Sequence, residues 1–142
     1  MSVLLFLEGV MAHLSLKKYQ QTTLSNAGEA SPYQLVALLF QKLLDNIATA
    51  KGAIVQKDYA KKGAQLSNAI AIVGVLEASL DHEKGGEISG NLSALYSFCS
   101  QKLFEANANN DIDLLNEIAL IIIPIKSGWD SIPPAEQGKV SF

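Results

Sequence analysis

Apolar residues recur in four long segments of this chain at spacings of three, four and seven positions, and short polar links join the segments. Such spacings keep apolar side chains on one face of a helix. No segment shows the alternation of apolar and polar residues that is typical of a half-buried strand. We therefore predict an all-α fold, an antiparallel up-down-up-down four-helix bundle with a mobile N-terminal arm.

Capping residues predict where the helices begin. Ser31 offers a side-chain oxygen as an N-cap and Pro32 suits a first helical position, so the first helix is expected from Pro32 to about Gln56. Asp58 is expected to cap the second helix, and the fourth begins at about Asp111. The chain is accordingly divided into an N-terminal extension and arm (residues 1–30), the bundle (31–132) and a C-terminal tail (133–142).

Two glycines and one proline modify this pattern. Gly85 and Gly86 tolerate positive φ angles, so we predict a tight turn there between the second and third helices, with Glu87 opening the third. Pro124 lies inside the fourth helical segment, where proline removes a hydrogen bond and clashes with the carbonyl four residues earlier. A bend is therefore expected between Leu120 and Pro124.

Each predicted helix has one apolar stripe that we assign to the core. The first and fourth helices are also apolar outside their stripes, which predicts a surface that something else covers: the arm, a second copy, or an amphipathic helix of a partner. The four stripes are Leu35, Leu39, Leu43, Ile47 and Ile54; Tyr59, Leu66, Ile70, Val73, Leu76 and Leu80; Ile88, Leu92, Leu95, Cys99, Leu103 and Ala106; and Leu115, Ile118, Ile122, Ile125 and Trp129.

Composition narrows the class of partner. Apolar residues make up 49% of the 142 residues and charged residues 18%, with a net charge of −3. The chain contains no arginine, the usual bidentate ligand for phosphate and guanine, which argues against nucleic acid as a partner. Its single cysteine, Cys99, forms no disulfide within the chain and suits a reducing cytoplasm.

The first eleven residues are apolar but do not form a convincing export signal. They lack a basic amino-terminal region and a small-residue cleavage site, and they are shorter than the roughly 20 apolar residues that span a bilayer. We therefore expect a cytoplasmic protein without membrane insertion. Met11 is an alternative natural start.

Candidate catalytic chemistry is sparse. His13, His82 and Cys99 belong to no recognisable constellation, and the Asp81-His82-Glu83 cluster has no second set of ligands. We expect no catalytic residue, no metal and no cofactor, and hence no enzyme. A phosphorelay module requires a histidine in mid-helix, and neither histidine is predicted there; a structural homodimer remains an alternative.

Several short motifs resemble one family in both order and spacing, from about Tyr19 to Trp129. Each motif is weak alone, but together they resemble the flagellar export chaperone for flagellin, the FliS family. Departures from the family pattern are the leader before Met11, Phe40 where tyrosine is common, and Gln41-Lys42 where Asp-Gly is frequent. The motifs are Tyr19-Gln20; Ala30-Ser31-Pro32; Gln34-Leu35; Leu38-Leu39-Phe40; Asp58-Tyr59; the Gly85-Gly86 turn with Asn91-Leu92 and Leu95-Tyr96; Glu105-Ala106-Asn107; and Trp129.

The resemblance implies a chaperone that binds the disordered C-terminal segment of flagellin, prevents premature polymerisation and assists delivery to the flagellar type III export apparatus. It also implies an arm that covers part of the binding surface, and further contacts with the export gate or other flagellar regulatory proteins. A homodimer that binds another flagellar partner is the alternative function. The expected partner-binding residues are Tyr19, Gln20, Leu24, Leu35, Leu38, Leu39, Phe40, Leu43, Leu114, Ile121 and Trp129.

Overall fold

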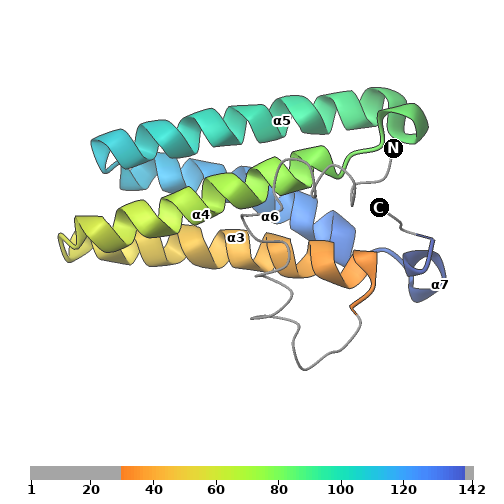
Figure 1. The fold of residues 1–142 in the computed structure, drawn as a ribbon, viewed down its shortest axis with the longest axis horizontal. Helices are drawn as coiled ribbons and strands as arrows, with labels where there is room; N and C mark the ends of the chain where they lie inside the picture. The colour runs from red at the N-terminus through yellow and green to blue at the C-terminus, as the bar shows by residue number, and fades with distance from the viewer. Residues whose placement is uncertain (1–29, 140–142) are drawn as a thin grey trace.

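The structure is a computed structural model that describes residues 30–139, and every regular element in that range is helical. Figure 1 shows four long helices side by side, each running opposite to the one before it, which confirms the predicted bundle. Helices α3 and α5 each pack against both α4 and α6, so the four form a closed ring. The elements are α3 (Pro32–Val55), α4 (Tyr59–Ala78), α5 (His82–Asn109), α6 (Ile112–Asp130) and α7 (Pro134–Gln137).

The predicted starts of α3, α4 and α6 are confirmed, and a side chain caps each of them. Ser31 and Gln34 form a reciprocal capping box: the Gln34 N–H donates to Ser31 Oγ at 3.2 Å and the Ser31 N–H to Gln34 Oε1 at 3.0 Å. Asp58 accepts from the third residue of α4, and Asp111 does the same for α6. These caps satisfy backbone donors that have no partner within the helix.

The predicted turn between the second and third helices is displaced. The chain reverses at residues 79–81, and Asp81 caps α5 by accepting from the N–H groups of Glu83 and Lys84, both at 3.0 Å. His82 thus lies in the first turn of α5 and not in a loop. Of the two glycines, only Gly86 has a positive φ, +53°. It kinks α5, and the helix resumes at Glu87. The helix therefore begins at the acidic N-cap Asp81, five residues before Gly86, and not after the two glycines.

The buried face of α5 also differs from the prediction. Ser89 and Tyr96 are buried, whereas Ile88 and Leu95, each one position earlier, are exposed. One residue corresponds to about 100° around a helix, so this single step changes which side chains face the core. The other third-helix positions follow the prediction, since Cys99, Leu103 and Ala106 are fully buried and Leu92 is half-buried.

One continuous core joins all four long helices. Two positions assigned to the second stripe differ from the prediction: Tyr59 is exposed, and Leu80 follows the end of α4. Helix α6 runs from Ile112 to Asp130 with Pro124 inside it, so the proline does not end the helix, and the bend expected between Leu120 and Pro124 stays a prediction. Helix α7 occupies part of the predicted tail. No described helix combines the length and apolar character needed to cross a membrane.

Candidate functional site

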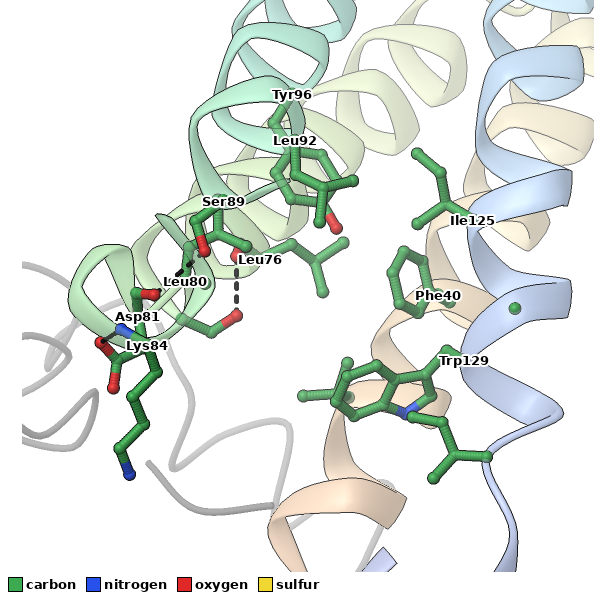
Figure 2. Close-up of a pocket in the computed structure, with 15 residues that line it drawn as sticks. Phe40, Leu76, Leu80, Asp81, Lys84, Ser89, Leu92, Tyr96, Ile125 and Trp129 are labelled. Carbon is green, nitrogen blue, oxygen red and sulfur yellow. Dashed lines mark hydrogen bonds between the residues drawn. The ribbon is translucent and has the colours of Figure 1, made fainter. Parts of the chain in front are cut away.

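A pocket of about 490 Å³ opens where four helix ends meet: the start of α3, the end of α4, the start of α5 and the end of α6 (Figure 2). Apolar side chains from all four helices form most of its wall. The link between α4 and α5 closes one side. The lining residues are Val36, Phe40, Leu76, Ser79, Leu80, Asp81, Lys84, Gly85, Ser89, Leu92, Tyr96, Ile125, Gly128, Trp129 and Ile132.

Trp129 fixes the wall formed by α6 against α3. Its indole Nε1–H donates to the backbone carbonyl of Tyr33 at 3.1 Å, and the Tyr33 hydroxyl donates to the backbone carbonyl of Trp129 at 3.2 Å. The two rings are stacked with centroids 5.4 Å apart. The Phe40 ring is tilted by 52° to that of Trp129, with the two centroids 6.5 Å apart. The polar atoms of Trp129 are thereby satisfied within the protein, and its ring presents apolar surface to the pocket.

The wall on the α5 side includes the first turn of α5, which a side-chain hydrogen bond joins to the rest of that helix. Ser89 Oγ donates to the Asp81 carbonyl at 3.0 Å across the kink at Gly86. Gly85 permits this approach, because a Cβ there would lie 1.8 Å from Ser89 Oγ. The N–H of Lys84, helped by that of Glu83, holds the pKa of the Asp81 carboxyl below its usual value.

Tyr96 and Cys99 are buried neighbours on α5. Burial, with a smaller contribution from Cys99, raises the pKa of Tyr96 to about 12, and burial raises the pKa of the Cys99 thiol to about 11. Both groups are therefore neutral near pH 7. A neutral, buried thiol is a poor nucleophile, so Cys99 behaves as a small core residue.

An apolar strip runs along one flank of α5 next to the pocket. Ser93 and Ser97 donate to Glu77 at 3.1 and 3.4 Å, which marks the flank that faces α4. Ile88, Leu95 and Phe98 lie on the opposite flank, where they are 70%, 39% and 44% exposed. The α5 strip, defined by these three side chains, is exposed apolar surface on a helix that also lines the pocket.

The structure places the predicted partner-binding residues in different environments. Phe40 and Trp129 line the pocket. Leu35, Leu39 and Leu43 are buried in the core and are not accessible in this structure. Partly buried at the edge of the core are Leu38, Leu114 and Ile121. Tyr19, Gln20 and Leu24 lie outside the described residues, so their contacts stay predictions.

The sequence pattern alone did not identify most of the pocket. The sequence pattern assigned three lining residues to core stripes: Leu76, Leu92 and Ile125. They do pack in or against the core, but their spacing gives no indication that they also border a pocket. Ser89 and Tyr96 were missed because the prediction placed their neighbours Ile88 and Leu95 on the buried face of α5 instead. The pocket forms only where four separate helix ends come together, and periodicity within one helix carries no signal for that.

The site is suited to binding apolar groups. Within residues 30–139, no three histidine, cysteine or acidic side chains are grouped in a way that could hold a metal ion. The aromatic and aliphatic wall favours an apolar ligand, and the α5 strip provides further surface of the same kind. A segment that presents a row of apolar side chains matches this arrangement.

Comparison with known proteins identifies the family. A family model described as "Flagellar protein FliS" matches residues 15–136. The chain is 40% identical over 119 residues to the flagellar secretion chaperone FliSB of Pseudomonas aeruginosa, which covers 83% of this chain and 94% of that protein. It is 38% identical over 129 residues to the flagellar secretion chaperone FliS of Salmonella typhimurium, and that match covers 89% of this chain and 93% of that protein. Matches of this extent show that the chain belongs to the FliS family of flagellar secretion chaperones.

Proposed function

We propose that this chain is a cytoplasmic chaperone that binds the disordered C-terminal segment of flagellin, prevents its premature polymerisation and assists its delivery to the flagellar type III export apparatus. It acts by binding and not by catalysis. Membership of a family of flagellar secretion chaperones supports an exported flagellar protein as the client. The apolar pocket and the α5 strip support a client segment with an apolar face.

The observation that carries the proposal is the apolar pocket at the four helix ends, to which the α5 strip adds exposed apolar side chains on a helix that also lines the pocket. Exposed large apolar side chains that are grouped on a protein are typical of interaction sites. A disordered amphipathic segment that folds as it binds buries apolar area but loses conformational entropy. Part of the gain is therefore offset, which keeps binding reversible and permits release of the client at the export apparatus.

Calorimetric titration with a peptide covering the C-terminal segment of the flagellin from the same organism tests the proposal. We expect saturable one-to-one binding with a negative heat-capacity change, because apolar surface is buried. Absence of binding by the folded chain, with a dimer that persists on dilution in light scattering, would instead support the homodimeric alternative.

Gly128 offers a way to obstruct the pocket without disturbing the core. It lines the pocket, and a Cβ at this position would meet no atom within 4 Å. We expect Gly128→Gln to lower the affinity for the flagellin segment by about tenfold or more, because the added side chain competes for the client's space.

Gly52→Gln is the matched control, since Gly52 is also helical, also has open space for a Cβ, and lies outside the pocket. This control should bind with wild-type affinity. Equal affinities for the two variants would show that the client does not use the pocket.

A further inference from the structure

Most polar groups around the pocket already have partners within the protein. Ser79 Oγ donates to the Leu76 carbonyl at 2.7 Å, and Ser89 Oγ donates to the Asp81 carbonyl at 3.0 Å. The indole N–H of Trp129 is bonded to the Tyr33 carbonyl. These groups stabilise the walls and are not free to recognise a ligand.

The Tyr96 hydroxyl differs from them. Tyr96 is only 3% exposed, yet it lines the pocket, and Figure 2 shows its hydroxyl oxygen directed into the space between Leu76, Phe40 and Ile125. It makes no hydrogen bond to any atom of residues 30–139. A hydrogen-bonding group is thus held in a part of the pocket where the side chains around it are apolar. Because burial raises its pKa to about 12, the hydroxyl keeps its proton near neutral pH and can donate it.

A hydroxyl that has no partner among residues 30–139 restricts what can occupy the pocket. Water can solvate the group while the pocket is open, but a ligand that displaces this water removes that partner. A purely hydrocarbon ligand would leave the hydroxyl dehydrated, which is unfavourable. A well-matched occupant therefore combines apolar side chains with one hydrogen-bond acceptor.

The end of an α-helix provides this combination. Carbonyl groups in the interior of a helix are bonded to N–H groups four residues later, whereas the last four have no partner within the helix. The pocket volume of about 490 Å³ is comparable with one helical turn including side chains, roughly 400–600 Å³ for a cylinder of helical pitch and diameter. A terminal turn would satisfy the hydroxyl and one of its own free carbonyls together.

We propose that the Tyr96 hydroxyl donates a hydrogen bond to a backbone carbonyl in the last turn of a helix formed by the bound client, so that the pocket receives a helix end. The inference rests on the proposed function, with the C-terminal segment of flagellin as the client. Tyr96 is thereby a specificity-determining residue, while the surrounding side chains supply the apolar contact.

Tyr96→Phe in the full chain is the first test, with calorimetric affinity for the flagellin segment as the readout. We expect the affinity to fall by about 5- to 20-fold, because the client carbonyl loses its donor. The melting temperature of the free chain should not fall, because the hydroxyl has no partner among the described residues. Tyr59→Phe, at the exposed start of α4 and outside the pocket, is the control and should match the wild type in both measurements.

A scan of amide-to-ester substitutions along the client peptide locates the acceptor, since an ester carbonyl is a weaker acceptor than an amide carbonyl. At one position near the end of the client's helix, the substitution should weaken binding to the wild type and have little further effect on Tyr96→Phe. Such non-additivity identifies a direct interaction between the two groups. Coupling to a polar client side chain and to no ester position would overturn the assignment of a backbone carbonyl.

The outcomes separate this inference from the proposed function. If the wild type binds the flagellin segment and Tyr96→Phe binds it equally well, the hydroxyl has no part in recognition and only this inference fails. If the wild type does not bind the segment at all, both fail. If Tyr96→Phe lowers the melting temperature along with the affinity, the hydroxyl supports the fold and the proposed recognition is overturned.

Discussion

At the scale of single residues, two glycines of α5 differ in whether a larger side chain would fit in their place. Gly85 lies where a Cβ would be 1.8 Å from Ser89 Oγ and 3.0 Å from Ser89 Cβ. A methyl group there would push Ser89 out of its hydrogen bond to the Asp81 carbonyl. Gly90, on the exposed side of α5, has no atom within 4 Å of a Cβ.

We predict that Gly85→Ala lowers the free energy of unfolding by about 1–2 kcal/mol, through the lost hydrogen bond and the close contact. Gly90→Ala should raise it by about 0.5–1 kcal/mol, because alanine favours the helix and restricts the unfolded chain. Urea denaturation measures both values. Equal stabilisation by the two substitutions would mean that Ser89 moves aside freely and that its hydrogen bond to the Asp81 carbonyl does not stabilise the first turn of α5.

Residue-level signals in the sequence predicted the caps well. Ser31, Asp58 and Asp111 act through backbone donors only a few residues away, so the sequence contains nearly all the information that their position requires. The start of α5 was predicted wrongly because two local signals compete there. The Asp81 cap begins the helix, and Gly86 only kinks it, an outcome that also depends on how Ser89 contacts Asp81.

At the scale of helices, Lys62 connects the start of α4 to the end of α5. Its side chain is only 8% exposed, and Nζ donates to the Asn107 carbonyl at 2.8 Å while lying 5.6 Å from the centre of the Tyr59 ring. A positive charge at a helix C-terminus interacts favourably with the helix dipole and with carbonyls that have no partner within the helix. Lys62 thus fastens α5 at the end of the bundle opposite to the pocket.

We expect Lys62→Met to lower the free energy of unfolding by about 1–3 kcal/mol, because methionine keeps the apolar stem but leaves the Asn107 carbonyl without its charged donor. Lys61→Met, on the exposed side of the same turn, is the matched control and should change stability by less than about 0.5 kcal/mol. Chemical denaturation gives both values. Equal effects would attribute the change to overall charge and not to the bond across the helices.

The helices themselves follow from the sequence, but their rotation is less well determined. Apolar spacing correctly predicted the buried face of α6 at Leu115, Ile118 and Ile122. On α5, apolar side chains occur on more than one face, so spacing did not distinguish Leu95 from Tyr96 as the buried position. Packing against α4 and α6 settles that choice, and it also leaves the α5 strip exposed.

At the scale of the whole molecule, the pocket depends on the arrangement of all four long helices. Val36, Leu76, Tyr96 and Ile125 come from four different helices and meet only in the assembled bundle. Sequence periodicity indicates that each is apolar and helical, but only the packing of the helix ends shows that the residues border an open space. The family resemblance predicted a binding protein, whereas its pocket required the three-dimensional structure.

Trp129 makes occupation of this pocket directly measurable, because it lines the pocket and is the single tryptophan in the chain. We predict that a flagellin segment without tryptophan shifts the Trp129 emission to shorter wavelength and reduces its quenching by acrylamide, since the client displaces water from around the indole. The Gly128→Gln variant should show neither change at the same peptide concentration. Binding at any site on the folded chain raises stability, by about 2.7 kcal/mol at a ligand concentration 100 times Kd, so a higher melting temperature alone does not locate the client. If calorimetry shows saturable binding while the Trp129 spectrum stays unchanged, the client binds elsewhere on the bundle. If binding changes both the heat and the Trp129 emission, and Gly128→Gln abolishes the change in emission, the client occupies the pocket at the four helix ends.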